Sequence, residues 1–455
     1  MRDLMLLGFL AAFFTLALGR PFLFVLAYAY VDIVAPQLIG YQLLANLHLS
    51  MVAAALAIGG WLIADARHGF NFGARQALML LLLAYVGITT VYADFPEAAQ
   101  SKWEWVWKSL FFAIFLPLTL RTRLRVESIL LVMILSAAAM IITGGIKTIL
   151  SGGGYGTLTL LVSDNSGLYE GSTASAVAIA IIPIILWLAR HGTVFVPDWR
   201  VRTFCYALSF ACLLIPIGTQ TRTGLLCIAA LAVLMLRDSK RRLLYIGGAA
   251  AMALMAVPFL PSSYTDRMTT IQDYQSDQSA STRLAIWGWT IEYVGGKPFG
   301  GGFEAYIQNR VSVQTVTSQT SGAVERISAT TTQDAGRAWH SAYFEMLGEQ
   351  GFPGLFLFLL IHVIGLARMQ RLRKRYRNPA EGEEWIAPLA TAFQNFQIVY
   401  LVGAAFIAVA FQPFIWMMLG AQIGFDRWVS RRRAEALRQP LAARIARRPA
   451  GAAGA

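Results

Sequence analysis

The hydrophobic residues of this chain fall in long blocks instead of alternating with polar ones. Most blocks are about 17–25 residues long, the length that a helix needs to cross roughly 30 Å of hydrocarbon. Backbone polar groups cannot stay unpaired in lipid, so the blocks predict helices. Membrane segments are expected near 3–19, 21–38, 46–64, 77–93, 106–120, 127–148, 174–190, 203–220, 223–236, 243–260, 346–367, 388–409 and 412–428. The first two segments join at Gly19–Arg20–Pro21 and count as one broken span in an alternative reading. The fold class predicted is all-α: a polytopic membrane protein of about 12 (12–13) transmembrane helices.

Composition supports this reading and excludes several others. Hydrophobic residues make up 56% of the chain and charged residues 14%, whereas soluble domains carry about a quarter charged residues. The net charge of +13 is interpreted as an excess of basic residues in cytoplasmic loops, and no nucleic-acid partner is expected. Cys205, Cys212 and Cys227 all lie inside apolar blocks, which indicates buried packing residues and not a disulfide framework or a metal site. The N-terminal block is interpreted as a retained membrane segment.

The basic residues indicate how the chain is oriented in the membrane. They cluster at 121–125, 237–242, 368–377 and 427–448, which are alternate loops and the C-terminal tail. Such clusters mark the cytoplasmic side. The loops near 39–45, 94–105, 149–173 and 261–345 are then expected on the opposite side. The tail after Arg431 is predicted to be a surface or unstructured segment close to anionic lipid.

The loop at 261–345 is the longest, with about 85 residues, and divides the chain. Between 261 and 341 it holds six basic and seven acidic residues, a net charge of −1. Loops of this length are uncommon unless they are functional or disordered. Residues 284–296 have helical apolar spacing, with Trp287 and Trp289 placed at the membrane interface. Residues 312–333 are predicted to be mobile. The expected domains are helices 1–10 (1–260), the loop with the catalytic residues (261–345), the C-terminal helices (346–430) and a basic cytoplasmic tail (431–455).

Two arginines on the extracytoplasmic side are candidates for binding an anion. Arg222, in IGTQTRTGLL, opens a helix between two apolar segments, where positive charge is uncommon and costly. Its guanidinium can hold phosphate oxygens in a two-pronged contact, and the helix N-terminus also favours an anion. Arg283, in STRLAIW, is expected in the first turn of the helical stretch of the loop, where a positive charge opposes the helix dipole. The alternatives are an arginine reaching to the interface and a solvated loop arginine.

His340 is the candidate general base. It lies where the long loop returns to the membrane, and an imidazole titrates near neutral pH. His68 and His191 lie beside arginines in cytoplasmic loops, His362 is interpreted as a packing residue, and His48 is a weaker candidate. The candidate supporting residues in the same segments are Gln220, Arg337, Tyr343 and Glu349.

The sequence predicts neither a cofactor nor a metal. It contains no D-x-D, C-x-x-C or H-E-x-x-H pattern, the first of which would suggest a divalent ion bound with a sugar nucleotide. The segment GKPFGGGFEAY (296–306) lacks the strand and helix context of a nucleotide-binding loop. A tight loop against the membrane is the better interpretation.

Four motifs together resemble the O-antigen ligase and O-antigen polymerase superfamily. TQTRTG (219–224), STRLAIW (281–287), KPFGGGF (297–303) and HSAYFEMLGEQGFPGLF (340–356) occur in this order, and the resemblance is clearest over 205–360. It implies a twelve-helix type of fold in a bacterial inner membrane, with a periplasmic loop that bears short helices. It also implies metal-independent transfer of a glycan from undecaprenyl diphosphate. Arg222 and Arg283 match the family's diphosphate-binding arginines, and His340 matches its essential histidine. The first 200 residues are similar in hydropathy to ligases associated with exosortase systems.

Several functions remain open at this point. The resemblance favours ligation of an O-antigen to lipid A-core, the lipid core of lipopolysaccharide. Transfer to a protein hydroxyl uses the same chemistry, and polymerisation of the repeat unit occurs within the same superfamily. A polymerase tends to carry two sizeable basic periplasmic loops, but here 149–173 is short and holds only Asp164 and Glu170 as charged residues. A flippase or other transporter of lipid-linked oligosaccharide would be expected to show repeats and ionisable residues halfway through the membrane.

Overall fold

The structure is a computed structural model, and it describes residues 2–40, 44, 47–64, 72–150, 167–237, 242, 278–321 and 324–438. The predicted membrane segment at 243–260, most of the predicted loop at 149–173 and the tail beyond 438 lie outside these residues.

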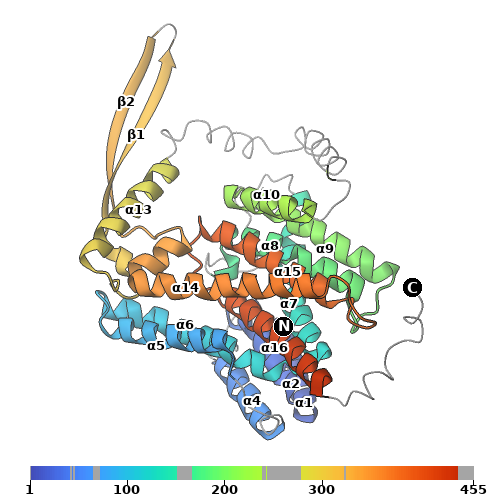
Figure 1. Cartoon of the computed structure of the whole chain (residues 1–455). Helices are drawn as coiled ribbons and strands as arrows, with labels where there is room; N and C mark the ends of the chain where they lie inside the picture. Colours follow the sequence, from blue (N-terminus) through green and yellow to red (C-terminus); the bar gives the residue numbers. More distant parts are fainter. Residues whose placement is uncertain are drawn as a thin grey trace.

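The described part is mainly helical, as the sequence predicted (Figure 1). Its helices in the first half of the chain are α1 (Arg2–Gly19), α2 (Phe22–Val34), α3 (Pro36–Ile39), α4 (Leu49–Ala64), α5 (Ala74–Val91), α6 (Pro96–Thr119), α7 (Arg123–Leu150), η1 (Gly167–Tyr169), α8 (Gly171–His191), α9 (Trp199–Gly218) and α10 (Arg222–Leu236). The second half contains α13 (Gln278–Gly296), η3 (Ala305–Gln308), α14 (Ala342–Arg375), α15 (Ile386–Ala404) and α16 (Pro413–Arg438).

Six of the described helices are long and apolar enough to cross a membrane. They are α1, α5, α7, α8, α9 and α14, and α2, α4 and α10 are shorter apolar helices. These helices indicate a multi-pass membrane protein. The predicted total of about twelve spans goes beyond what the described helices establish.

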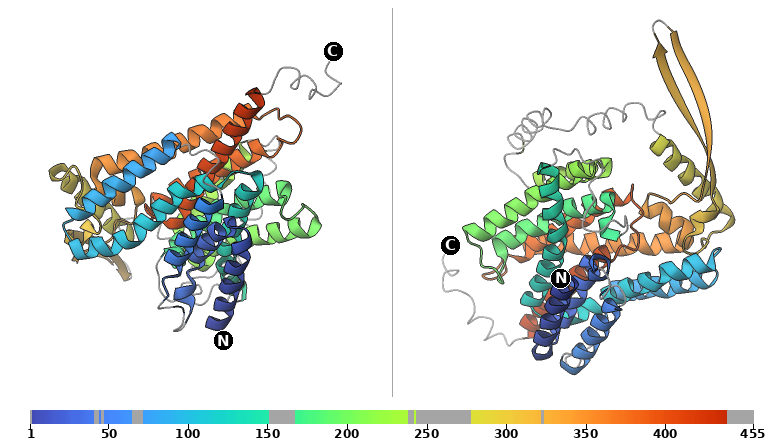
Figure 2. Two further views of the ribbon diagram at one scale, coloured as in Figure 1. Left: turned by 90° about the horizontal axis from the view of Figure 1, so that it is seen from below. Right: turned by 180° about the vertical axis from the view of Figure 1, so that it is seen from behind.

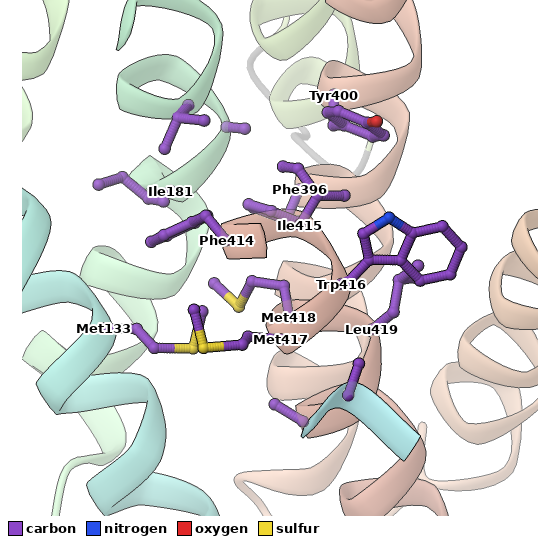
Figure 3. Close-up of a cluster of buried hydrophobic side chains, with 14 of the residues drawn as sticks. Met133, Ile181, Phe396, Tyr400, Phe414, Ile415, Trp416, Met417, Met418 and Leu419 are labelled. Carbon is purple, nitrogen blue, oxygen red and sulfur yellow. The ribbon is translucent and has the colours of Figure 1, made fainter. Parts of the chain in front are cut away.

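Helix α8 lies at the centre of the bundle. In the 18-residue apolar stretch of this helix, 89% of the residues are buried. The helix packs against α7, α9, α10 and α15. Figure 3 shows part of this core, where Met133 of α7 and Ile181 of α8 face Phe396 of α15 and Phe414 of α16. Large apolar and aromatic side chains interdigitate here, so the dispersion contacts of a dense interior hold the helices together.

Several described helices extend beyond their predicted bounds, and α6 and α16 show this clearly. Helix α6 begins at Pro96 instead of near 106, because proline suits the first helical turn and the polar residues after it lie on the helix. The predicted loop at 94–105 therefore shrinks to 92–95. Helix α16 continues to Arg438, so the first part of the expected tail is helical.

The long loop contains a β-hairpin, which the sequence analysis did not predict for 312–333. Strand β1 (Arg310–Ser321) pairs antiparallel with β2 (Val324–Ala335), with Arg310 opposite Ala335. Both strands are rich in threonine, and β1 also contains three valines; these residues fit extended backbone well. At about 3.3 Å per residue, strands of this length reach roughly 40 Å, and the hairpin projects far from the helices (Figures 1 and 2). The loop that was expected to bear short helices carries α13 and η3 as well as this hairpin.

The orientation of the chain leads to a first testable prediction. Reporter fusions after Arg242 and Arg377 should read cytoplasmic, and a fusion at Gln314 on β1 should read periplasmic, because basic residues are retained on the cytoplasmic side. The measurement is the paired activity of a periplasmic and a cytoplasmic reporter at each position. A cytoplasmic reading at Gln314 would place Arg222, Arg283 and His340 in the wrong compartment for a periplasmic reaction.

Candidate functional site

A small aromatic core holds the point at which the long loop re-enters the bundle. Buried Trp339 packs with Ile286 of α13, Ala305 of η3 and Val311 of β1. Its backbone carbonyl accepts a hydrogen bond of 3.0 Å from Trp287 Nε1. The loop helix, the base of the hairpin and the start of α14 are therefore one packed unit, and His340 follows Trp339 directly in the chain.

The backbone of His340 is held in a conformation that histidine adopts infrequently. Its φ is +47°, in the left-handed region that costs most non-glycine residues about 1–2 kcal/mol. Buried Trp339 precedes it and Ser341, the first residue before α14, follows it and is 1% exposed. The residue as a whole is exposed, although its imidazole is partly desolvated. Strained residues of this kind persist where the surrounding structure fixes them, and they cluster at functional sites.

Arg283 lies on the face of α13 that packs against this segment. It precedes Trp287 by four residues, so the two side chains share one helix face. Trp287 in turn stacks on Phe344 of α14, with ring centroids 4.9 Å apart. The helix starts at Gln278, five residues before Arg283. The prediction that Arg283 occupies the first turn is therefore wrong, because the Gln-Ser-Ala-Ser-Thr stretch before it is itself helical.

Three charged residues act electrostatically on His340: Arg283 and Arg337, which the sequence predicted as site residues, and Glu170, which it did not. The pKa of His340 is lowered from 6.5, first by desolvation and then by the positive charge of Arg283, with a smaller effect of Arg337. The carboxylate of Glu170 acts in the opposite direction. Arg283 and Glu170 are therefore near enough to the imidazole to act on it. A histidine with a lowered pKa is neutral at pH 7 and can accept a proton.

Glu170 and the turn that bears Arg222 meet at the N-terminus of α8. The Glu170 carboxylate caps α8 by accepting hydrogen bonds from the backbone nitrogens of Ser172 (3.0 Å) and Thr173 (2.6 Å). One turn further, Ser175 Oγ lies 2.8 Å from Thr219 Oγ1 and 2.9 Å from Thr221 Oγ1. Arg222 directly follows Thr221 and is the first residue of α10, as predicted. The N-terminus of α8 thus links the Arg222 turn to the surroundings of His340.

Glycines fasten the Gly-rich segment of the loop onto α14. Gly301 and Gly302 donate backbone hydrogen bonds to the carbonyls of Gly348 (3.0 Å) and Glu349 (2.9 Å). Gly300 and Gly351 both have positive φ and approach each other's backbone so closely that a Cβ on either would clash. The segment is a tight loop packed against the start of a membrane helix, as the sequence indicated. The segment follows α13 directly, so its hydrogen bonds to α14 hold the end of α13 against that helix.

Beneath this loop lies a buried ionic cluster, defined by Lys102 of α6 and Glu304, Glu345 and Glu349. Lys102 Nζ is 2.8 Å from carboxylate oxygens of both Glu345 and Glu349, and 3.6 Å from Glu304. Glu349 also accepts a hydrogen bond of 3.0 Å from the backbone nitrogen of Glu304, and Glu345 accepts one of 2.9 Å from Ala410. The candidate supporting residue Glu349 therefore joins α6, α14 and the loop.

Substitution of Lys102 by methionine should destabilise the protein strongly. It would leave Glu345 and Glu349, which are 4% and 0% exposed, without their cation, and removal of one partner of a buried pair costs about 3–5 kcal/mol. The measurement is thermal unfolding of the purified protein in detergent. The matched control is Lys297→Met, because the Lys297 side chain that pairs with Asp94 is 46% exposed and exposed pairs contribute about 1 kcal/mol or less. An equal loss of thermal stability in both variants would show that burial does not make the Lys102 cluster more important for stability than an exposed ion pair.

The other candidate supporting residues have structural contacts of their own. Tyr343 donates its hydroxyl to the carbonyl of Leu401 on α15, at 2.8 Å. Arg337 pairs with Asp334 at 3.1 Å, and buried Gln220 has a φ of +52° in the turn before Arg222. His362 is 1% exposed and its Nδ1 lies 2.9 Å from Gln397 Nε2, which agrees with the prediction of a packing residue.

The candidate arginines and histidine are suited to binding an anion next to a group that accepts a proton. Within the described ranges, no group of three or more histidine, cysteine or acidic side chains is arranged to hold a metal ion, and the three cysteines are buried and free. The candidate residues are Arg283 of α13 and His340, which precedes α14, with Arg222 at the start of α10 in a turn bonded to α8. Guanidinium groups bind phosphate oxygens through charge-assisted hydrogen bonds.

These features describe a multi-pass membrane protein with a candidate site of arginines and a histidine where its long loop packs against the helices. Residues 207–359 match the O-antigen ligase family, and this match includes Arg222, Arg283 and His340. The resemblance to the O-antigen ligase superfamily, stated from the four motifs, is thereby confirmed. Residues 1–193 match a family of unknown function. No curated protein matches the chain.

Proposed function

We propose that this protein is a glycosyltransferase of the ligase type, which moves a glycan from a polyprenyl diphosphate to a hydroxyl acceptor on the periplasmic side of the inner membrane. The family match supports a membrane ligase in general. The observation that carries the specific proposal is the packing of the helix that bears Arg283 against the segment that holds His340, with the Arg222 turn bonded to the end of α8 that Glu170 caps. Undecaprenyl diphosphate is the donor carrier that the resemblance implies, and lipid A-core is the favoured acceptor.

In the proposed reaction, Arg222 and Arg283 hold the diphosphate and stabilise the negative charge that develops as it leaves. Neutral His340 accepts the proton of the acceptor hydroxyl while that oxygen attacks the anomeric carbon. The bond from that carbon to the diphosphate oxygen breaks, and the configuration at the anomeric carbon is inverted. The diphosphate ester is already activated, so the transfer needs no nucleotide.

A transporter is the competing proposal from another class, and the described charges favour it less. Besides the Lys102 cluster beneath the long loop, a group of ion pairs between described helices joins buried Arg75 of α5 to Asp426 of α16 at 3.5 Å, and partly exposed Arg368 of α14 to Asp426 at 2.8 Å. Arg75 is the second residue of α5, so this group lies near a helix end. A transport site is expected near the bilayer midplane.

The proposal is tested with the purified full-length protein, a defined polyprenyl-diphosphate glycan and separate lipid A-core and protein acceptors. Glycan transfer to one acceptor is expected. Release of free diphosphate carrier without transfer, or growth of the donor glycan instead, would point to hydrolysis or polymerisation. The glycan profile of lipopolysaccharide and of proteins in a deletion strain then identifies the acceptor in the cell.

Transfer should not depend on a divalent metal, because two arginines are available to neutralise the diphosphate. We expect the same rate in excess EDTA as in buffer containing Mg²⁺. The measurement is the initial transfer rate before and after chelation. Activity that is lost in EDTA and restored by Mg²⁺ or Mn²⁺ would contradict the metal-independent mechanism.

A further inference from the structure

A cavity of about 830 Å³ opens between α8, α10, α14 and α15. Its lining on α8 runs from Pro183 to His191, the last residue of that helix, whereas Glu170 lies before the first. At 1.5 Å per residue, α8 is about 30 Å long. The cavity is therefore at the end of the bundle opposite the candidate site, where the loop from α14 to α15 turns back (Figure 1).

Each helix contributes one face to the cavity. On α8 the lining residues follow i, i+3, i+4, i+7 spacing from Pro183 to Arg190, and on α14 Gln370, Arg373 and Lys374 follow i, i+3, i+4 spacing, with Arg377 just beyond the helix end. Residues with this spacing form a stripe along a helix. The cavity is thus a groove bounded by packed helices, with a floor inside the bundle and a rim at its end.

The rim of the groove is strongly basic. Arg190, Arg373, Lys374 and Arg377 line it, and Glu384 is its single acidic lining residue, which leaves an excess of three positive charges when His191 is neutral. Arg190, Lys374 and Arg377 are exposed, so their charged groups are available to a bound molecule. Several basic groups around one opening attract an anion more strongly than the same charges spread over a surface.

The floor of the groove is mainly apolar, with one polar exception. Leu186, Trp187 and Ala392 line it, and exposed Met235 of α10 borders it. Asn395 is 5% exposed, also lines the groove, and has a side-chain oxygen without a hydrogen-bond partner in the described structure. Buried polar atoms are nearly always bonded to protein, water or ligand. A suitable occupant is therefore anionic at one end and apolar at the other, with polar groups between.

We propose that this groove binds an anionic glycerophospholipid from the leaflet on this side of the membrane, which the basic clusters identify as the cytoplasmic one. The phosphate would lie among Lys374, Arg377 and Arg190, the acyl chains against Trp187 and Leu186, and the linkage region near Asn395. Basic pockets between membrane helices bind phospholipid headgroups in this way. This proposal does not depend on the glycosyl transfer proposed above.

The test uses the full-length protein, purified in detergent and titrated with phosphatidylglycerol or phosphatidylcholine. Retained lipid is counted by native mass spectrometry, and the unfolding temperature is followed during the titration. The wild-type protein should retain phosphatidylglycerol in preference to phosphatidylcholine and should be stabilised by it. Lys374→Glu/Arg377→Glu should weaken this binding at least tenfold. Both residues are exposed, so the variant is expected to fold.

The matched control is Arg371→Glu/Arg375→Glu. These exposed arginines lie on α14 beside Lys374 but do not line the groove, so binding should change less than twofold. Equal weakening in the two double variants would mean attraction to the basic surface in general and would overturn the proposal. Equal retention of phosphatidylcholine would also overturn it. Stabilisation by inorganic phosphate alone, to the same extent as by phosphatidylglycerol, would identify a site for a soluble anion instead.

Discussion

His340→Ala should lower the transfer rate by about 10²–10⁴, the usual contribution of a positioned general base, and leave donor binding unchanged. The imidazole acts on the acceptor hydroxyl in the proposed reaction, whereas the arginines hold the donor. The residue is exposed, so its truncation removes no core packing. Turnover of a defined donor and binding of that donor are measured separately in nanodiscs.

The control for this experiment is His48→Ala, a second exposed histidine that is expected on the same face. It should retain near wild-type turnover. If His48→Ala lost activity and His340→Ala kept it, the base would be misassigned, and the site would have to be rebuilt around the segment near residue 48.

The pH profile provides an independent reading of the same residue. Because the pKa of His340 is lowered from 6.5, the imidazole is neutral and active at pH 7, and activity should fall only as the pH drops through a value below 6.5. Glu170→Gln removes a negative charge that favours the protonated imidazole, so the acidic limb should move to lower pH. The glutamine oxygen can still accept one of the two capping hydrogen bonds that the carboxylate oxygens accept from Ser172 and Thr173. Glu292→Gln, an exposed change on α13, should not move the limb.

The sequence predicts those parts of the fold and site that depend on local pattern. Apolar blocks predicted the positions of most described helices, and the change from apolar to polar residues at 219–223 predicted that Arg222 opens α10. The Gly-rich segment at 296–306 was correctly interpreted as a tight loop, because positive φ and close backbone approach require glycine. These features need only a few neighbouring residues to specify them.

The parts that were missed depend on residues far apart in the chain. Lys102 is separated from Glu345 by 243 positions, and its polar neighbours hid the first two turns of α6. Glu170 was noted only as an acidic loop residue, although it is followed by the Gly-Ser-Thr stretch that it caps. The hairpin was missed because Ser, Thr and Gln give little hydrophobic alternation, and alternation is the main signal of a strand.

Arg222→Lys should impair the protein although the positive charge is kept. An ammonium group cannot reproduce the planar, two-pronged contact of a guanidinium with phosphate oxygens. Loss of one charge-assisted hydrogen bond, about 1.5–3 kcal/mol, corresponds to donor binding that is weaker by roughly 10–100-fold. Turnover at saturating donor should fall as well, because the same contact stabilises the leaving diphosphate. Arg283→Ala should resemble Arg222→Ala in this respect more than it resembles His340→Ala.

The measurement is donor affinity and turnover for Arg222→Lys beside Arg310→Lys as the matched control. Arg310 is an exposed arginine at the base of the hairpin, where it donates to the backbone carbonyls of Ile307 and Asn309. Its replacement should leave donor affinity within about twofold of the wild type, since a lysine ammonium can also donate to carbonyls. Unchanged donor affinity in Arg222→Lys, together with normal turnover, would remove Arg222 from the diphosphate site. Loss of turnover alone would assign it to the transition state, because only interactions that strengthen there raise the chemical rate.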